Sequence, residues 1–273
     1  MSKNSLLAEV YPHLEIMKAG KYTVNGKEVI LNKVVSTIEN TNSLAQLPAP
    51  PNSRGEITLE KIDTVSCILE QDPSEKIGVL SFASARAPGG GFVKGRNAQE
   101  ECLCHKSNLY PTLKEQRRFY NENWATEGGL ATQNLIISKD VTFFKDMDGN
   151  LVENPILTTV VTAPAVDYRN IRDDERKFAR STMVTRMDNI MKAFILSGSK
   201  TIILGAFGCG VFKNDPTEIA TIFKELLINK GYIRYFDKVI FAIPGNMSLD
   251  FYNKNADKNY DAFQRIFRHS LKK

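Results

Sequence analysis

Two adjacent glutamates, Glu100 and Glu101, follow a run of three glycines at positions 89–91. An apolar run that ends at Phe82 precedes the glycines, so we expect them to form a loop between a buried strand and a helix. Glycine lets backbone N–H groups approach a phosphate closely and tolerates positive φ angles. A helix that begins near Asn97 would add further N–H donors. The stretch therefore predicts phosphate binding combined with carboxylate chemistry.

The two carboxylates have two interpretations. With Asn97 as the N-cap, Glu100 falls at position N3 and completes a capping box, which is a structural role. Alternatively, neighbouring helical side chains project about 100° apart, so one carboxylate can bind sugar hydroxyls while the other protonates a leaving oxygen, as in glycosidic cleavage. A helix N-terminus favours the ionised form, so an acid here needs burial or a neighbouring negative charge to raise its pKa.

A second glycine-rich segment, residues 205–210, also follows an apolar run that is expected to be a strand. Asp215 and Pro216 then have the residue types of an N-cap and an N1 position, which predicts a helix start. Ligands of open α/β sheets lie at the carboxyl ends of strands. Two glycine loops in this context favour a phosphate or pyrophosphate ligand over two unrelated tight turns. Neither loop is a Walker A sequence, and neither fits G-x-G-x-x-G at the start of a helix.

Three other groups of residues carry weaker signals. Cys102, Cys104 and His105 have metal-binding side chains, but their spacing spreads them around a helix and no second ligand pair follows. Cys209 is a candidate nucleophile, yet no histidine lies near it in sequence, which favours a small loop residue. Residues 146–150 lack the third acid and closing glutamate of a calcium loop and are interpreted as a turn. We expect neither a metal nor a cofactor.

The elements that would position these residues alternate between strands and helices from residue 56 onwards. Strands are expected at 57–62, 76–83, 135–138, 141–145, 155–162, 200–204 and 236–243, and helices at 64–70, 98–120 with a break near Pro111, 183–195, 216–227 and beyond 260. This order predicts an α/β layered sheet, with the Asn-Gly hairpin outside it.

Residues 1–55 are predicted to form an extension that packs on a core domain of residues 56–273. An N-terminal helix is followed by Asn25-Gly26, which between β-forming residues predicts a hairpin. A second short helix is expected over residues 31–47, ahead of a proline-rich connector.

Composition narrows the class of protein. The chain has 273 residues, of which 42% are hydrophobic and 25% charged, values typical of a soluble globular protein. The net charge of +5 mildly favours polyanionic partners. No apolar run approaches the roughly 20 residues that span a bilayer, and no signal peptide is evident. Four dispersed cysteines suggest reduced thiols. We therefore expect a cytoplasmic protein with no membrane partner and no sequence-specific nucleic-acid partner.

The order of these motifs resembles that of the bacterial-type poly(ADP-ribose) glycohydrolases. The resemblance rests on Gly89-Gly90-Gly91, seven residues and then Gln99-Glu100-Glu101, and it extends through residues 82–86 and 204–216 to nearly the whole chain. It implies a macrodomain-like three-layer α/β/α sandwich with a mixed central sheet and an N-terminal helical and hairpin extension.

The resemblance also implies an activity, namely hydrolysis of the ribose–ribose O-glycosidic bond of poly(ADP-ribose), from chain ends, to release ADP-ribose. Glu101 would be the general acid and Glu100 would bind ribose hydroxyls. The implied ligand-binding residues are Ser84, Gly89, Gly90, Gly91, Phe92, Gln99, Gly208, Cys209, Gly210, Val211 and Phe212. Ser81 and Ala87 stand where the family commonly has asparagine, which predicts a lower affinity or rate. Two alternatives stay open: hydrolysis of mono-ADP-ribose from a protein side chain or nucleic acid, and a non-catalytic ADP-ribose reader.

Overall fold

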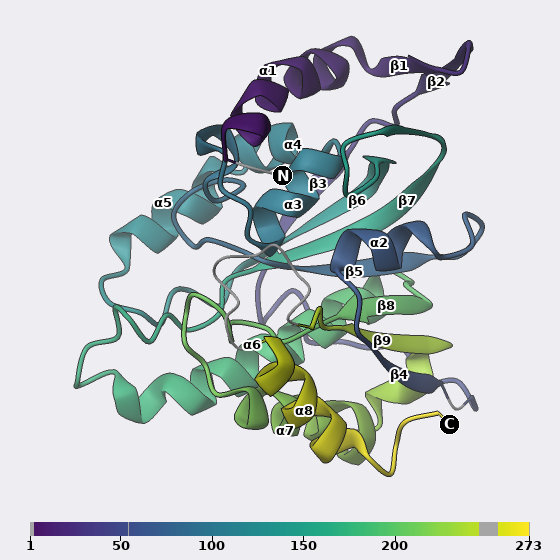
Figure 1. Cartoon of the computed structure of the whole chain (residues 1–273). Coiled ribbons are helices and arrows are strands. Elements are labelled where there is room, and N and C mark those ends of the chain that lie inside the picture. The colour runs from purple at the N-terminus through teal and green to yellow at the C-terminus, as the bar shows by residue number, and fades with distance from the viewer. Residues whose placement is uncertain (1–2, 54, 246–255, 273) are drawn as a thin grey trace.

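The computed structural model describes residues 3–53, 55–245 and 256–272 (Figure 1). In chain order the elements are α1 (Lys3–Ala19), β1 (Lys21–Val24), β2 (Lys27–Ile30), β3 (Val35–Glu39), β4 (Glu56–Glu60), α2 (Thr64–Leu69), β5 (Ile77–Phe82), η1 (Phe92–Lys94), α3 (Gln99–Lys106), α4 (Leu109–Glu115), α5 (Arg117–Ala125), β6 (Leu135–Lys145), β7 (Leu151–Ala163), α6 (Arg176–Leu196), β8 (Thr201–Leu204), α7 (Pro216–Lys224), η2 (Glu225–Asn229), η3 (Tyr232–Tyr235), β9 (Lys238–Ala242) and α8 (Ala256–Phe267).

Within these described residues, seven strands form one mixed sheet in the order β3-β6-β7-β5-β8-β9-β4. The five strands β7, β5, β8, β9 and β4 pair in parallel, whereas β6 is antiparallel to both β3 and β7. Parallel neighbours need crossover connections, which the helices supply. Figure 1 shows α2, α3 and α4 on one face of the sheet and α6, α7 and α8 on the other. The predicted α/β fold with a mixed central sheet between two helical layers is confirmed.

Alternate residues of the central strands face the two helical layers. Val79 on β5 packs in the core that contains Leu103 of α3, whereas its neighbour Leu80 packs in the core that contains Phe194 of α6 and Phe223 of α7. All five side chains are fully buried. A parallel strand buried on both faces needs apolar residues at successive positions, which is why 77–82 is an almost continuous apolar run.

The predicted short helix at 31–47 is wrong, because the structure places strand β3 there. Val35 to Glu39 pair antiparallel with β6, and the Ser36 hydroxyl lies 2.6 Å from that of Thr112 and 2.8 Å from that of Ser138. β-Branched residues favour a strand wherever a partner is available, and the partner strand lies about one hundred residues further along the chain. The hairpin at Asn25 is confirmed. The domain division at residue 55 stays a prediction.

The expected helix over 98–120 is three helices, α3, α4 and α5. The first break lies at Ser107-Asn108, and Pro111 sits within the first turn of α4, where its missing N–H group is not needed. The Asn108 side chain accepts a hydrogen bond from the Thr142 N–H group of β6 at 2.8 Å. The break therefore attaches the end of α3 to the sheet.

Candidate active site

A large cavity lies at the carboxyl ends of the parallel strands. Its volume is about 860 Å³, and its walls include a residue from the loop after each of five strands: Asp63 after β4, Ser84 after β5, Arg169 after β7, Gly208 after β8 and Pro244 after β9. Parallel strands present their carboxyl ends at one edge of a sheet. The topology therefore brings both glycine loops and both glutamates to the same place.

The first glycine loop is compact and left-handed. Gly89 and Gly90 have φ angles of 63° and 58°. A Cβ atom on Gly90 would lie 2.5 Å from Oε1 of Glu101, closer than real Cβ atoms come, and 3.0 Å from Oε2 of Glu100, which is a tight contact. Both carboxylates therefore contact the same glycine, and only glycine fits between them.

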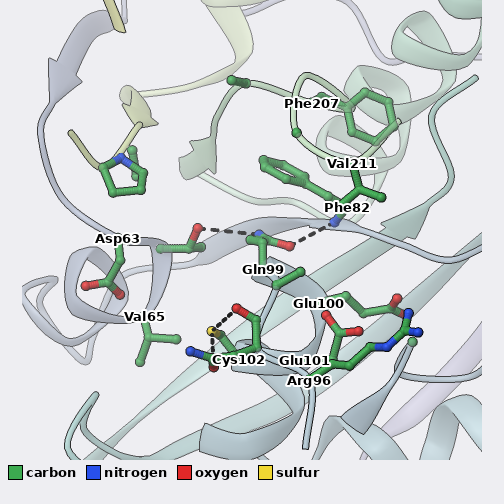
Figure 2. Close-up of a pocket in the computed structure, with 18 of the residues that line it drawn as sticks. Asp63, Val65, Phe82, Arg96, Gln99, Glu100, Glu101, Cys102, Phe207 and Val211 are labelled. Atoms are coloured by element: carbon green, nitrogen blue, oxygen red, sulfur yellow. Dashed lines mark hydrogen bonds between the residues drawn. The ribbon is translucent and has the colours of Figure 1, made fainter. Parts of the chain in front are cut away.

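Each glutamate is held by one backbone N–H group of this loop. Oε1 of Glu101 accepts a hydrogen bond from the N–H of Gly91, and Oε2 of Glu100 accepts one from the N–H of Ser84, both at 2.7 Å. Glu100 is 3% and Glu101 6% exposed. Figure 2 shows both side chains projecting from the start of α3 into the cavity, opposite Phe207 and Val211 of the second loop. The loop thus fixes two buried carboxylates at one wall.

The expected capping box is wrong. The N-cap of α3 is Ala98, and no side chain caps the helix. The Asn97 side chain instead accepts a contact from the Cys102 thiol at 3.0 Å. The Glu100 carboxylate bonds to Ser84, sixteen residues earlier in the chain, and so does not reach back to its own helix start. The capping alternative for Glu100 is therefore removed.

The environment of Glu100 favours its protonated form. Burial raises the pKa of the Glu100 carboxyl well above its usual range, the Ser84 N–H bond opposes this shift, and the negative charge of Glu101 adds to it. Oε1 of Glu100 has no hydrogen-bond partner among the described residues. A buried oxygen in this state is available to a hydroxyl group of a ligand.

Gln99 completes the hydrogen bonding of β5 beyond its pairing with β8, which ends at Val79. The N–H of Ala83 bonds to β7. Main-chain N–H and C=O groups alternate in direction along a strand, so those of the even-numbered residues of β5 point towards the side of β8. There the Gln99 side chain accepts from the N–H of Phe82 at 2.9 Å and donates to the carbonyl of Leu80 at 2.8 Å. Its amide thus takes the place of a neighbouring strand and fixes α3 on the sheet.

The second glycine loop forms the opposite wall. Gly208 has a φ angle of 74° and lies against Asn214, whereas a Cβ atom on Gly210 would meet no atom within 4 Å. The guanidinium of Arg169 lies over the ring of Phe212, 5.1 Å from its centre. The predicted helix start is confirmed, because Asp215 accepts hydrogen bonds from the N–H groups two and three residues further on.

Most of the predicted site residues line the cavity: Ser84, Gly90, Gly91, Gln99, Glu100, Glu101, Gly208, Gly210, Val211 and Phe212. Three other predicted residues, Gly89, Phe92 and Cys209, are not among the described residues that line the cavity. The Phe92 ring is fully buried between His105 and Tyr110, with ring centres 4.5 Å from each. Burial also raises the pKa of the Cys209 thiol, which argues against a nucleophile.

Sequence reasoning missed several cavity residues, among them Asp63, Arg96 and Arg169. Asp63 and Arg169 follow the carboxyl ends of β4 and β7. Their position just after predicted strands was the sequence signal that could have assigned them to the cavity. The described residues hold no group of three or more His, Cys, Asp and Glu side chains arranged for a metal ion, and no described helix is long and apolar enough to cross a membrane.

The cavity combines glycine loops suited to phosphate with two buried carboxylates suited to cleaving an acetal bond. These features define the class of protein as a glycosidase that acts on a phosphorylated sugar. The family model for the microbial-type PARG catalytic domain matches residues 12–146. Comparison with curated proteins gives no match. Over these residues the chain is similar to the microbial-type poly(ADP-ribose) glycohydrolases.

Solved structures agree with this family along most of the chain. The poly(ADP-ribose) glycohydrolase of Thermomonospora curvata is 29% identical, with a TM-score of 0.86 over 97% of this chain and 100% of that chain. The same enzyme bound to the inhibitor ADP-HPD gives a TM-score of 0.83 at 29% identity, over 96% and 99% of the two chains. The Deinococcus radiodurans enzyme in complex with ADP-ribose is 27% identical, with a TM-score of 0.76 over 85% of this chain and 94% of that one.

Proposed function

We propose that this protein hydrolyses poly(ADP-ribose) at its ribose–ribose O-glycosidic bonds and releases ADP-ribose. The observation that carries the proposal is the pair of buried carboxylates that contact Gly90 from the start of α3. The match to the family model over residues 12–146 and the likeness to enzymes solved with ADP-ribose and ADP-HPD support it. Cys67, Cys104 and Cys209 are buried free thiols, which supports our further proposal that the protein works in the cytoplasm.

Glu101 is the proposed general acid. Its proton passes to the oxygen that leaves with the remaining polymer, while the bond from that oxygen to the anomeric carbon breaks. Water then adds to the oxocarbenium carbon, and the carboxylate of Glu101 takes the proton that this water loses. The Gly91 N–H group holds Oε1 at 2.7 Å, which leaves Oε2 free of that bond and available to the leaving oxygen.

Glu100 is the proposed ribose-binding carboxyl. Its raised pKa means that it carries a proton more readily than an ordinary glutamate, so it can both donate to and accept from sugar hydroxyls. A neutral Glu100 also avoids placing two negative charges side by side when Glu101 becomes ionised after proton transfer.

The two glycine loops are the proposed diphosphate cradle. Gly90 and Gly91 lie on one wall and Gly208 and Gly210 on the other. The N–H groups of Gly90 and Gly91 already donate to the Ala87 carbonyl and to Glu101, so these two glycines would allow the diphosphate to approach closely. Gly208 and Gly210 would supply backbone N–H donors to its oxygens. Phe212, on the second wall, would pack on the terminal ribose. A ribose enclosed in this way favours cleavage from chain ends.

The test is the substitution Glu101→Gln, assayed by release of ADP-ribose from polymer. A general acid contributes about 10²- to 10⁴-fold, so kcat should fall by at least about a hundredfold, while ADP-ribose binding measured by calorimetry should persist. The matched control is Glu115→Gln, an exposed glutamate at the end of α4 outside the cavity, and its kcat should stay at the wild-type level.

Full activity of Glu101→Gln would refute the assignment. A wild-type protein that binds ADP-ribose but cleaves nothing would establish the non-catalytic reader. The mono-ADP-ribosyl hydrolase is tested with a mono-modified protein in the same assay, and faster release from that substrate than from polymer would favour it.

A further inference from the structure

A short rigid turn connects the first glycine loop to α3. Phe92, fully buried between His105 and Tyr110, fixes one end of η1. Gly95 ends it with a left-handed φ of 64°, and the N–H of Arg96 returns to the carbonyl of Gly91 at 3.2 Å. The main chain of this turn is therefore held in place, which sets where its exposed side chains begin.

Two cations project from this turn at the rim of the cavity. Lys94 and Arg96 are both exposed and both line the cavity. The stem of Arg96 lies over Gly91, where its Cγ would be 2.6 Å from a Cβ atom. Gly91 also donates its N–H group to Glu101, so the Arg96 stem and the proposed general acid both contact the same loop residue. Figure 2 shows Arg96 and Glu101 at one end of the cavity and Asp63 and Val65 at the other.

Other cations close to the cavity already have partners. Arg169 pairs with Asp167 at 2.7 Å, and Lys61 lies over the ring of Tyr260 at 4.7 Å. In contrast, neither Lys94 nor Arg96 makes an ion pair with any of the described residues. An Arg and a Lys held at a rim without a carboxylate are suited to an anionic ligand group.

We propose that Arg96 and Lys94 bind the diphosphate of the polymer unit on the leaving side of the scissile bond. This inference rests on the proposed function. The unit to be released fills the cavity between the glycine loops, so the scissile oxygen lies at Glu101 and the next unit lies beyond it, at the rim with Arg96. The ribose that carries this oxygen also carries a diphosphate, which brings two negative charges to the two cations.

The subsite gives the enzyme a preference for polymer. A mono-ADP-ribosylated side chain presents no phosphate on the leaving side, so it gains nothing from Arg96 and Lys94. The interaction with the leaving unit should be present in the bound substrate and should therefore affect KM more than kcat.

The experiment compares two substrates with different leaving groups. One is poly(ADP-ribose), and the other is ADP-ribose with a neutral nitrophenyl group at the anomeric carbon. We compare the kcat/KM on polymer with the kcat/KM on the glycoside. In Arg96→Ala and in Lys94→Ala the ratio of these two values should fall about tenfold, which is at the lower end of the effect of losing one charge-assisted hydrogen bond. Arg96→Lys should recover part of the ratio. The matched control is Arg268→Ala, an exposed arginine beyond α8 outside this cavity.

The outcomes separate this inference from the proposed function. A wild-type protein that releases no ADP-ribose from polymer contradicts the proposed function itself. An active wild type whose ratio is unchanged in both alanine variants overturns the subsite. An equal loss on both substrates also overturns it, because the cations would then act on Glu101 or on folding and not on the leaving unit.

Discussion

Gly90→Ala is expected to disable the site through two separate effects. The first is backbone strain, because a residue with a Cβ atom at a φ of 58° costs about 1 kcal/mol or slightly more. The second is a collision. The new methyl group would lie 2.5 Å from Oε1 of Glu101, so that carboxylate must move by at least about 0.5 Å to reach even 3.0 Å.

The new methyl group would collide with Oε1 of Glu101, an atom that already accepts a hydrogen bond. Oε1 of Glu101 is the acceptor of the Gly91 N–H group at 2.7 Å, so the movement weakens this charge-assisted bond and misplaces the acid. A misplacement of about 1 Å can cost about a hundredfold in rate. We therefore expect kcat for ADP-ribose release to fall by roughly ten- to a hundredfold, and the melting temperature to fall by about 2–4 °C per kcal/mol.

Gly198→Ala separates the two effects. Gly198 also has a positive φ, 76°, but a Cβ atom there would meet nothing within 4 Å. It lies just after α6, away from the cavity. This variant should therefore show the loss of melting temperature without the loss of kcat. If Gly90→Ala keeps more than half of the wild-type kcat, the contact of Gly90 with both carboxylates does not position them, and the reasoning fails.

Two further predictions concern stability. Burial lowers the pKa of His13 to about 3, so the folded state binds fewer protons than the unfolded state below pH 6.5, and stability is lost as pH falls from 6.5 towards 3. In urea unfolding between pH 7 and pH 5, the unfolding free energy of His13→Gln should fall by about 2 kcal/mol less than that of the wild type. Gln99→Leu should lower the free energy of unfolding by about 2–3 kcal/mol at pH 7, because two main-chain groups of β5 lose their partner. The control Gln264→Leu, at an exposed position, should change it by no more than about 0.5 kcal/mol. A Gln99 variant as stable as the wild type would mean that the amide does not replace a strand partner.

The sequence predicted those parts of the site that depend on local residue types. Glycine triplets, apolar runs and the Asp215-Pro216 helix start all act within a few residues, so both loops and their neighbouring strands could be located in advance. The order of strands and helices was enough to predict where the loops meet, because parallel strands share an edge.

Other features depend on partners that are distant in the chain. Strand β3 forms against β6, about one hundred residues away, so its segment alone gave a wrong helix. Glu100 bonds to Ser84 and not to its own helix start, which no local capping rule can anticipate. Phe92 follows the glycines directly, yet the packing of His105 and Tyr110 turns it into the core.

The pairing of β3 has a consequence for aggregation. β6 is an eleven-residue strand of largely buried residues, and without β3 its outer row of main-chain N–H and C=O groups would be open to a strand from another molecule. The five residues of β3 cover Leu135 to Lys139, and a short outermost strand is itself a poor template for such pairing. A segment that precedes the first glycine loop by about fifty residues thus helps to keep separate copies of the sheet from joining edge to edge.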